Sequence, residues 1–233
     1  MSSFILKILA LLFMIIDHTG FILFPNAIIF RAIGRLALPL FAYQMAVGFS
    51  HTKNKKKHIL KLLAFATICQ IPYILMLNLY QVSLTLNILF TFVLALCAIC
   101  LLENIHLEKT PSKWKKVTSI LKNIALFLLS MFLVWLGCYL EVDYTWYGIL
   151  LTIGFYFTLK QKSLSLLVLF ILINLKFFTS QTLMNALTYI SLFDIFFILA
   201  FNGKKGYQHP WIFYLLYFAH FFPLLLIKYF SIS

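Results

Sequence analysis

Long apolar runs follow one another along the whole chain, separated by short polar stretches. Within each run the apolar residues are nearly continuous, which is typical of helices in lipid and not of barrel strands, where apolar and polar residues alternate. A membrane-spanning helix needs about 20 apolar residues, so the pattern predicts about nine transmembrane helices, with a range of about eight to ten because the sixth and seventh runs are short. The runs cover residues 4–24, 28–49, 59–77, 84–102, 120–140, 146–159, 164–178, 183–201 and 211–230.

The composition supports a membrane protein. Hydrophobic residues make up 63% of the 233 residues and charged residues only 11%, whereas soluble domains have about 45–50% and about 25%. A soluble fold has no place to bury so much apolar surface, but a fold in lipid has an apolar exterior as well. We therefore predict an all-α polytopic membrane helix bundle. No linker separates two parts of the chain, so residues 1–233 are expected to form a single transmembrane domain.

The net charge of +13 comes mostly from lysines in the loops between the runs. With nine spans and a cytoplasmic N-terminus, the lysine-bearing loops all fall on one side of the membrane, and the positive-inside rule makes that side cytoplasmic. This topology accounts for the charge, so no nucleic-acid partner is expected, and the predicted location is the cell (plasma or inner) membrane. The lysine-bearing loops lie at residues 51–58, 109–116, 160–162 and 204–205.

Two cysteines, Cys97 and Cys100, form a CxxC pair on a predicted helix. Such a pair is found in redox and metal sites, but a metal site needs further ligands and the chain has no second ligand pair. We interpret both as small packing residues and predict no metal site.

Charged residues inside the apolar runs are expected to mark function, because a charge in the bilayer core costs at least about 2.5–3.5 kcal/mol. Asp17 and His18 lie toward the outer end of the first run. As neighbours on a helix they do not share a face, so at most one should point straight at a common site. Arg31 and Arg35 do share a face, and Arg35 is within reach of an ion pair with Asp17, functional or purely structural. Asp194, in the eighth run, has no evident partner.

Further candidates are polar residues near the middle or the ends of other runs. His220 lies near the middle of the last run, one turn after Tyr217, and is either a base or a neutral group bonded to a neighbouring helix. Asn87 and Gln70 are interhelical hydrogen-bonding groups or substrate contacts. Asp143 is a substrate contact or a solvated loop carboxylate.

Several short blocks of the chain, taken together and in order, resemble the TraX family of membrane proteins. They run from the first predicted span to the last. The final block departs from the family pattern, in which a proline is expected near Phe218, because here the proline is Pro223. The blocks are FMIIDHTG at 13–20, RAIGRLALPLFA at 31–42, GFSHT at 48–52, QIP at 70–72, NILFT at 87–91, DY at 143–144, YGIL at 147–150, NGKKG at 202–206 and FYLLYFAH at 213–220.

The resemblance implies an acyltransferase. TraX is similar to multi-pass acyltransferases and acetylates the N-terminus of conjugative pilin, so the family implies transfer of an acetyl group from acetyl-CoA to an amine or hydroxyl. The acceptor does not carry over, and both a pilin-like peptide N-terminus and an envelope glycan are expected as candidates. Since the acyl-CoA donor is cytosolic and the polar residues lie toward the other side, we hypothesise that the acyl group crosses the membrane before transfer.

The resemblance also suggests roles for the candidate residues. Acyl transfer needs a base and a group that stabilises the developing oxyanion. The base is His18 or His220, with Asp17 orienting a histidine or pairing with Arg35. The lysine-rich loops are expected to attract the anionic donor. Arg35, Tyr217 and Asn87 are candidates to stabilise negative charge, and the remaining expected substrate and cofactor contacts are Arg31, Gln70, Asp143, Lys204 and Lys205.

Two other classes of function fit the same polar residues. A proton-coupled transporter or channel also places Asp, His and Arg within the membrane, although the inverted repeat that favours transport is not visible in the chain. A non-catalytic membrane assembly factor requires no reactive site at all. Loss of acyl-CoA turnover on replacement of His18 or His220 would separate an enzyme from both.

Overall fold

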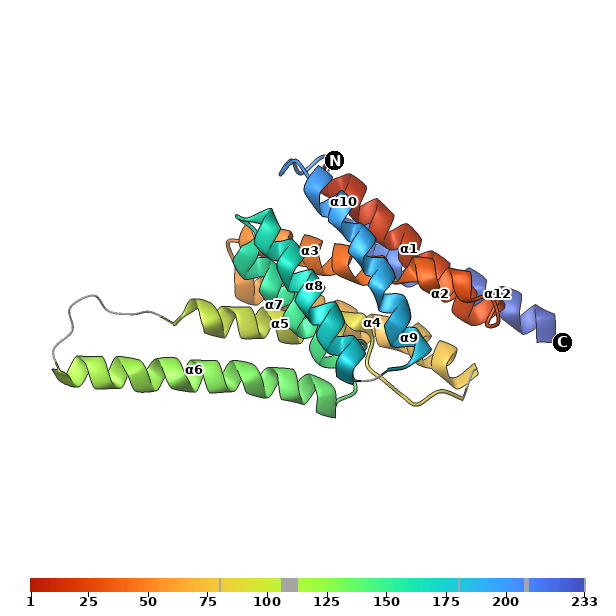
Figure 1. The fold of residues 1–233 in the computed structure, drawn as a ribbon. Helices are drawn as coiled ribbons and strands as arrows, with labels where there is room; N and C mark the ends of the chain where they lie inside the picture. Colours follow the sequence, from red (N-terminus) through yellow and green to blue (C-terminus); the bar gives the residue numbers. More distant parts are fainter. Residues whose placement is uncertain (80, 106–112, 180, 208–209, 233) are drawn as a thin grey trace.

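The computed structural model describes the chain except for residues 80, 106–112, 180, 208–209 and 233, and gives only the backbone at 113–116, 210–211 and 231–232. The described part is a bundle of helices without a β-strand (Figure 1). The elements are α1 (Ser3–Leu23), α2 (Ile28–Gly34), α3 (Ala37–Ser50), α4 (Lys55–Leu79), α5 (Ile88–Glu103), α6 (Lys113–Tyr139), α7 (Thr145–Thr158), α8 (Lys162–Thr179), α9 (Leu183–Leu187), the 3-10 helix η1 (Thr188–Phe193), α10 (Asp194–Ala200), α11 (Pro210–Ala219) and α12 (Phe221–Ile232).

The prediction of a polytopic helix bundle is confirmed. Within the described residues, 7 helical segments are long and apolar enough to cross a membrane, and they coincide with seven of the predicted runs. The fourth and sixth runs form shorter helices, α5 with 16 residues and α7 with 14. Both pack inside the bundle, where neighbouring helices shield them from lipid. The 7 segments are Ser3–Leu23, Ile28–Ser50, Lys55–Leu79, Val117–Tyr139, Lys162–Thr179, Leu183–Ala200 and Ile212–Phe230.

Helix α5 begins later than the apolar pattern predicts, because Asn87 caps it. The Asn87 side chain accepts a hydrogen bond from the Leu89 backbone N–H, as N-cap residues do. Just before the cap, Leu86 pairs with Val142 in an isolated β-bridge. The residues before Asn87 are therefore extended and not helical, and they tie the start of α5 to the loop between α6 and α7.

Two predicted runs are broken where a proline follows. A proline ring clashes with the carbonyl four residues earlier and lacks the N–H that would bond to it. For Pro39 that carbonyl belongs to Arg35, where α2 ends and α3 has not begun. For Pro223 it belongs to Ala219, the last residue of α11. Proline alone is not sufficient, since Pro72 lies inside α4 without interrupting it.

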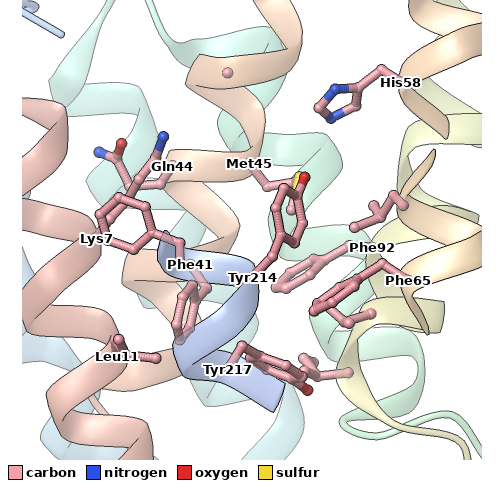
Figure 2. Close-up of a pocket in the computed structure, with 15 residues that line it drawn as sticks. Lys7, Leu11, Phe41, Gln44, Met45, His58, Phe65, Phe92, Tyr214 and Tyr217 are labelled. Carbon is pink, nitrogen blue, oxygen red and sulfur yellow. The ribbon is translucent and has the colours of Figure 1, made fainter. Parts of the chain in front are cut away.

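Helix α3 is the centre of the bundle. In the α2–α3 span, 72% of the most apolar stretch is buried, against 6% in α6, which lies at the edge of the bundle (Figure 1). Helix α3 packs against α1 on one side and α7 on another. Helix α11 lies near α1 and α4, and its aromatic side chains border a cavity there (Figure 2).

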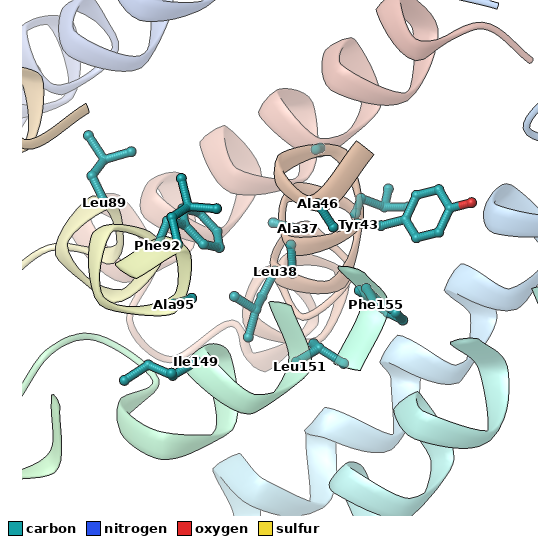
Figure 3. Packing of buried hydrophobic residues seen from close by; sticks show 14 of the residues in the cluster. Ala37, Leu38, Tyr43, Ala46, Leu89, Phe92, Ala95, Ile149, Leu151 and Phe155 are labelled. Carbon is teal, nitrogen blue, oxygen red and sulfur yellow. The ribbon is translucent and has the colours of Figure 1, made fainter. Parts of the chain in front are cut away.

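Buried residues of α3, α5 and α7 pack together in the hydrophobic core (Figure 3). Small residues alternate with large ones at these contacts, so that the helices approach closely, as is usual where lipid is no less apolar than the protein interior. The residues labelled are Ala37, Leu38, Tyr43 and Ala46 of α3, Leu89, Phe92 and Ala95 of α5, and Ile149, Leu151 and Phe155 of α7.

Lysine-bearing loops meet at one end of the bundle, called the lysine-rich end below. Ser3 N–H bonds to the Lys204 carbonyl at 2.8 Å, and the Lys162 ammonium bonds to the Leu199 carbonyl at 2.8 Å. Lys55 pairs with Glu103 at the same end. Of the predicted lysine loops, Lys109 lies outside the described residues. The loop containing Glu141 and Asp143 lies at the opposite end, which fits the predicted topology.

A labelling experiment tests that topology. In a variant without the native cysteines, we introduce Lys53→Cys at the lysine-rich end or Asn26→Cys at the opposite end, both at exposed positions. A membrane-impermeant thiol reagent should label Asn26→Cys in intact cells and Lys53→Cys only after permeabilisation. Labelling of both positions from the same side would contradict the topology.

The contact between α1 and α2 gives a test of packing. A Cβ atom on Gly34 would lie 2.2 Å from the Asp17 Oδ1 atom, whereas a Cβ on Gly48 meets nothing within 4 Å. Gly34→Ala should therefore destabilise the protein by about 1–3 kcal/mol through overpacking. Gly48→Ala should be neutral or slightly stabilising, because alanine favours a helix over glycine. Melting temperatures in detergent measure both; equal values for the two variants would show that the close approach at Gly34 is not tight.

Candidate functional site

Asp17 on α1 holds Arg31 of α2 and Arg35, the residue directly after α2, in one ion cluster. The Asp17 Oδ2 atom lies 2.7 Å from Arg31 Nη1, and Oδ1 lies 3.3 Å from Arg35 Nη2. The ion pair with Arg35 is the one that the sequence suggests, and Arg31 adds a second and shorter contact. One turn of helix separates the arginines, and Arg35 Nε also donates to the Arg31 carbonyl at 3.2 Å. The three side chains carry one net positive charge between them.

His18 and His220 form a hydrogen-bonded pair. His18 Nδ1 lies 2.7 Å from His220 Nε2, and the two rings are stacked with centroids 4.9 Å apart. His220 is the residue between α11 and α12, so the break that Pro223 causes places this imidazole against α1. The Phe221 ring packs against both histidines. The other His220 nitrogen, Nδ1, is buried and has no hydrogen-bond partner among the described residues.

A small cavity of about 40 Å³ lies beside one member of the ion cluster and one member of the histidine pair. Both Asp17 and His18 line it, which differs from the expectation that at most one of them faces a common site. The cavity touches two adjacent faces of α1, so that neighbouring residues both reach it. The other lining residues are Met14, Gly34, Ala37, Leu38, Phe41, Tyr73, Ile88, Asp143, Tyr144 and Tyr217.

The loop after α6 brings Asp143 to this cavity. Its backbone is fixed on both sides, because Asp143 N–H donates to the Leu86 carbonyl at 2.8 Å and the Asp143 carbonyl accepts from the Thr91 hydroxyl at 2.6 Å. Burial raises the pKa of the Asp143 carboxyl to about 6, and the positive charge of Arg35 partly opposes that rise. Asp143 is therefore a half-buried group at the cavity and not a solvated loop carboxylate.

Three residues at or near the site are absent from the sequence-based candidates. Tyr144 follows Asp143 in a left-handed conformation with φ 59° and lies under Arg35, whose guanidinium is 5.6 Å from the ring centre. Lys176 of α8 lies 4.8 Å from the same ring. Tyr73 of α4 lines the cavity. Tyr144 stands in the DY block that resembles the family, which is a sequence signal for it. Tyr73 and Lys176 are an ordinary aromatic and an ordinary basic residue in their own stretches, so only the assembled fold reveals them.

Asn87 and Gln70 lie outside the cavity and make structural contacts. The Gln70 amide oxygen accepts from the Asn87 backbone N–H at 2.9 Å and from the Asn87 side chain at 2.8 Å. Gln70 also donates to the Thr85 carbonyl at 2.8 Å. These bonds connect α4 to the start of α5. The expected substrate contact by Asn87 or Gln70 therefore stays a prediction. The geometry does not favour it, because both side chains bond within the protein and lie outside the small cavity.

The remaining candidates fall in different places. Tyr217 is buried and lines the small cavity as well as a larger one of about 170 Å³. Lys204 and Lys205 are exposed at the lysine-rich end and line neither cavity, so their expected role in binding acetyl-CoA has no geometric support. Asp194 is fully buried in α10, and its carboxylate has no hydrogen-bond partner among the described residues.

The arrangement as a whole places His18 and two carboxylates, Asp17 and Asp143, on one cavity. His220 lies behind His18, and the two arginines pair with Asp17 beside the cavity without lining it. Such a set can remove a proton from a bound group and stabilise negative charge that develops nearby. The groups come from α1, α2, the loop before α7 and the break between α11 and α12, so the fold assembles them from distant parts of the sequence.

Comparison with known proteins gives two similar curated relatives and no matching solved structure. A protein named "Probable fimbrial assembly protein FimC, serogroup H1" from Dichelobacter nodosus is 34% identical over 110 residues, which are 42% of this chain and 45% of that protein. An uncharacterized protein of Rickettsia prowazekii (strain Madrid E) is 31% identical over 140 residues, 60% of this chain and 49% of that protein. The chain thus spans less than half the length of the curated relatives it matches.

The family model described as "TraX protein" matches residues 2–228. This range includes every element from α1 to most of α12, and with them the ion cluster, the histidine pair and the cavity that Asp17 and His18 line. The chain therefore belongs to the TraX family.

Proposed function

We propose that the protein is an acyltransferase of the cell (plasma or inner) membrane, which moves an acetyl group from acetyl-CoA to an amine or hydroxyl acceptor. The observation that carries the proposal is the His18 imidazole, which lines a cavity beside the Asp17–Arg31–Arg35 cluster and is hydrogen-bonded to His220 at 2.7 Å. Membership of the TraX family supports the same reaction class.

His18 is the proposed base and His220 its positioning residue. His18 lines the cavity, whereas His220 lies behind it and contacts His18. When His18 Nδ1–H donates to His220, the Nε2 atom of His18 keeps its lone pair free to accept a proton. The second histidine thereby fixes both the tautomer and the orientation of the first.

The reaction then follows in balanced steps. His18 Nε2 takes the proton of the acceptor amine while the amine nitrogen bonds to the thioester carbonyl carbon, which gives a tetrahedral intermediate with a negative oxygen. The guanidinium groups of Arg31 and Arg35, which lie beside the cavity without lining it, stabilise that oxyanion by their positive charge. The C–S bond breaks, the CoA sulfur takes the proton from His18, and the products are an acetylated acceptor and free CoA thiol.

For the acceptor we favour a peptide N-terminus over an envelope glycan. The name of the Dichelobacter nodosus relative refers to fimbrial assembly, and fimbriae are built from protein subunits. An amine is also the acceptor for which Asp143 is suited, since a carboxylate at the cavity pairs with an ammonium group. The ammonium gives its first proton to water before the attack, and His18 takes the second during it.

An assembly factor without catalytic activity is the second candidate, and the same relative's name favours it. In that case the cluster of Asp17, Arg31 and Arg35 acts only to hold α1 and α2 together. The two functions differ in whether acetyl-CoA is consumed.

Replacement of the histidines tests the proposal. With labelled acetyl-CoA and a short peptide with a free N-terminus, His18→Ala should lower kcat by about 10²–10⁴-fold, the usual contribution of a general base. His220→Gln should lower kcat by a smaller factor with an unchanged KM for acetyl-CoA. The matched control is His51→Ala, which replaces an exposed loop histidine and should keep full activity. Full acetyl transfer by a folded His18→Ala protein would overturn the assignment.

The pH dependence of an Asp143→Asn variant tests the acceptor. Because the Asp143 carboxyl has a raised pKa of about 6, it is ionised above that pH and neutral below it. Asp143→Asn should raise the KM for an amine acceptor above pH 6, and the difference from the wild type should shrink as the pH falls through 6, where the wild-type carboxyl also loses its charge. A constant difference at all pH values, or none, would argue against an ammonium bound by Asp143.

A further inference from the structure

The larger cavity, of about 170 Å³, lies between α1, α3, α4, α5 and α11. Its lining is mostly aromatic and aliphatic, and three of its residues, Phe41, Ile88 and Tyr217, also line the small cavity that holds His18. The two cavities are therefore neighbours with a shared wall. Figure 2 shows His58 at one end of the larger cavity and Tyr217 at the other.

The part of the larger cavity that is farthest from His18 lies at the lysine-rich end of the bundle. Lys7, Gly48 and His58 line it there, close to the termini of α1, α3 and α4. Gly48 is exposed, and the space beside it is empty, since a Cβ atom at this position meets nothing within 4 Å. The cavity thus reaches the surface beside a cation, which suits the entry of a ligand whose exposed part is anionic.

Two buried polar atoms of the lining have no partner among the described residues, Gln44 Nε2 and His58 Nε2. Gln44 is 4% exposed, and its amide oxygen already accepts from the Ser3 hydroxyl at 2.5 Å. Ser3 thereby fixes the amide so that its NH₂ group remains available. A buried donor without a partner is costly, so a ligand with a carbonyl oxygen fits this position.

We propose that the larger cavity binds the pantetheine arm of acyl-CoA, entering at the lysine-rich end with the thioester at the wall of Phe41, Ile88 and Tyr217. The inference rests on the proposed function. The arm is a slender chain with two amide carbonyls, which matches an apolar cavity with the Gln44 NH₂ donor and leaves the CoA phosphates outside near Lys7. The acetyl group, still bonded to the CoA sulfur, then reaches past the wall into the cavity that His18 lines.

The volumes of the two cavities limit the size of the pantetheine arm and of the acyl group that they can hold. Since a water-sized group needs about 10–15 Å³ of cavity measured in this way, the larger cavity of about 170 Å³ holds on the order of a dozen such groups. The small cavity of about 40 Å³ holds about three, the number of non-hydrogen atoms in an acetyl group. The wall and the small cavity together select acetyl over longer acyl groups.

A bulky residue at Gly48 tests the binding site. Gly48→Trp should block the cavity at its mouth and weaken the binding of acetyl-CoA to the purified full-length protein at least tenfold, as measured by calorimetry. The matched control is Ser50→Trp, which places the same ring on an exposed position of α3 that lines neither cavity. Unchanged acetyl-CoA binding by Gly48→Trp would overturn the proposal.

Acetyl-CoA binding and acetyl transfer are measured separately, so the binding site and the enzymatic activity can fail independently. If no acceptor is acetylated but Gly48→Trp still loses acetyl-CoA binding, the proposed function fails and the binding site holds. If acetyl transfer occurs and Gly48→Trp binds and transfers like the wild type, the function holds and the cavity has another occupant, such as a lipid chain.

Enlarging the wall tests the proposal without blocking the mouth. Ile88 is half-buried and has one face on each cavity. Ile88→Ala should raise the rate with butyryl-CoA relative to acetyl-CoA about tenfold, because the removed atoms make room for a longer acyl group. An equal ratio of the butyryl-CoA rate to the acetyl-CoA rate in Ile88→Ala and in the wild type would contradict the role of the wall. This test does not depend on whether Gly48→Trp folds.

Discussion

The buried carboxylate of Asp17 is the interaction on which the site depends. It lies within an apolar bundle between two guanidinium groups, at 2.7 Å from Arg31 and 3.3 Å from Arg35. Removing one member of a buried ion pair typically costs about 3–5 kcal/mol, because the remaining charge loses its partner. Gly34 permits the close approach of α1 and α2 at this point. The cluster therefore sets the position of α1, and with it the position of the next residue, His18.

Helix breaks place the other reactive groups. Arg35 and His220 both lie where a helix is interrupted four or three residues before a proline, and the interruption lets each side chain face α1. The loop before α7 is fixed by its bridge to Leu86 and so brings Asp143 to the same cavity. Polar groups that would each be costly in lipid are thus gathered around one small space, where they satisfy or oppose one another's charge.

Much of this arrangement follows from the sequence. The apolar runs predict the helices, since lipid demands them, and the Asp17–Arg35 pair follows from helical spacing and the cost of buried charge. Spacing within one run does not show that His18 meets His220, a contact across 202 positions. It also does not show that Asn87 caps a helix or that Gln44 lines a cavity, because those roles depend on where helices end and how they pack.

The larger cavity opens at the lysine-rich end, and the His18 cavity lies toward the other end, beside Asp143. An acetyl group that passes between them crosses much of the bundle inside the protein. The direct test of this crossing is acetyl transfer across the membrane of sealed vesicles. Labelled acetyl-CoA is supplied at the lysine-rich side, and a peptide with a free amine is enclosed on the other side. The account predicts labelled peptide inside the vesicles. Unlabelled peptide, from protein that still binds acetyl-CoA, would contradict it.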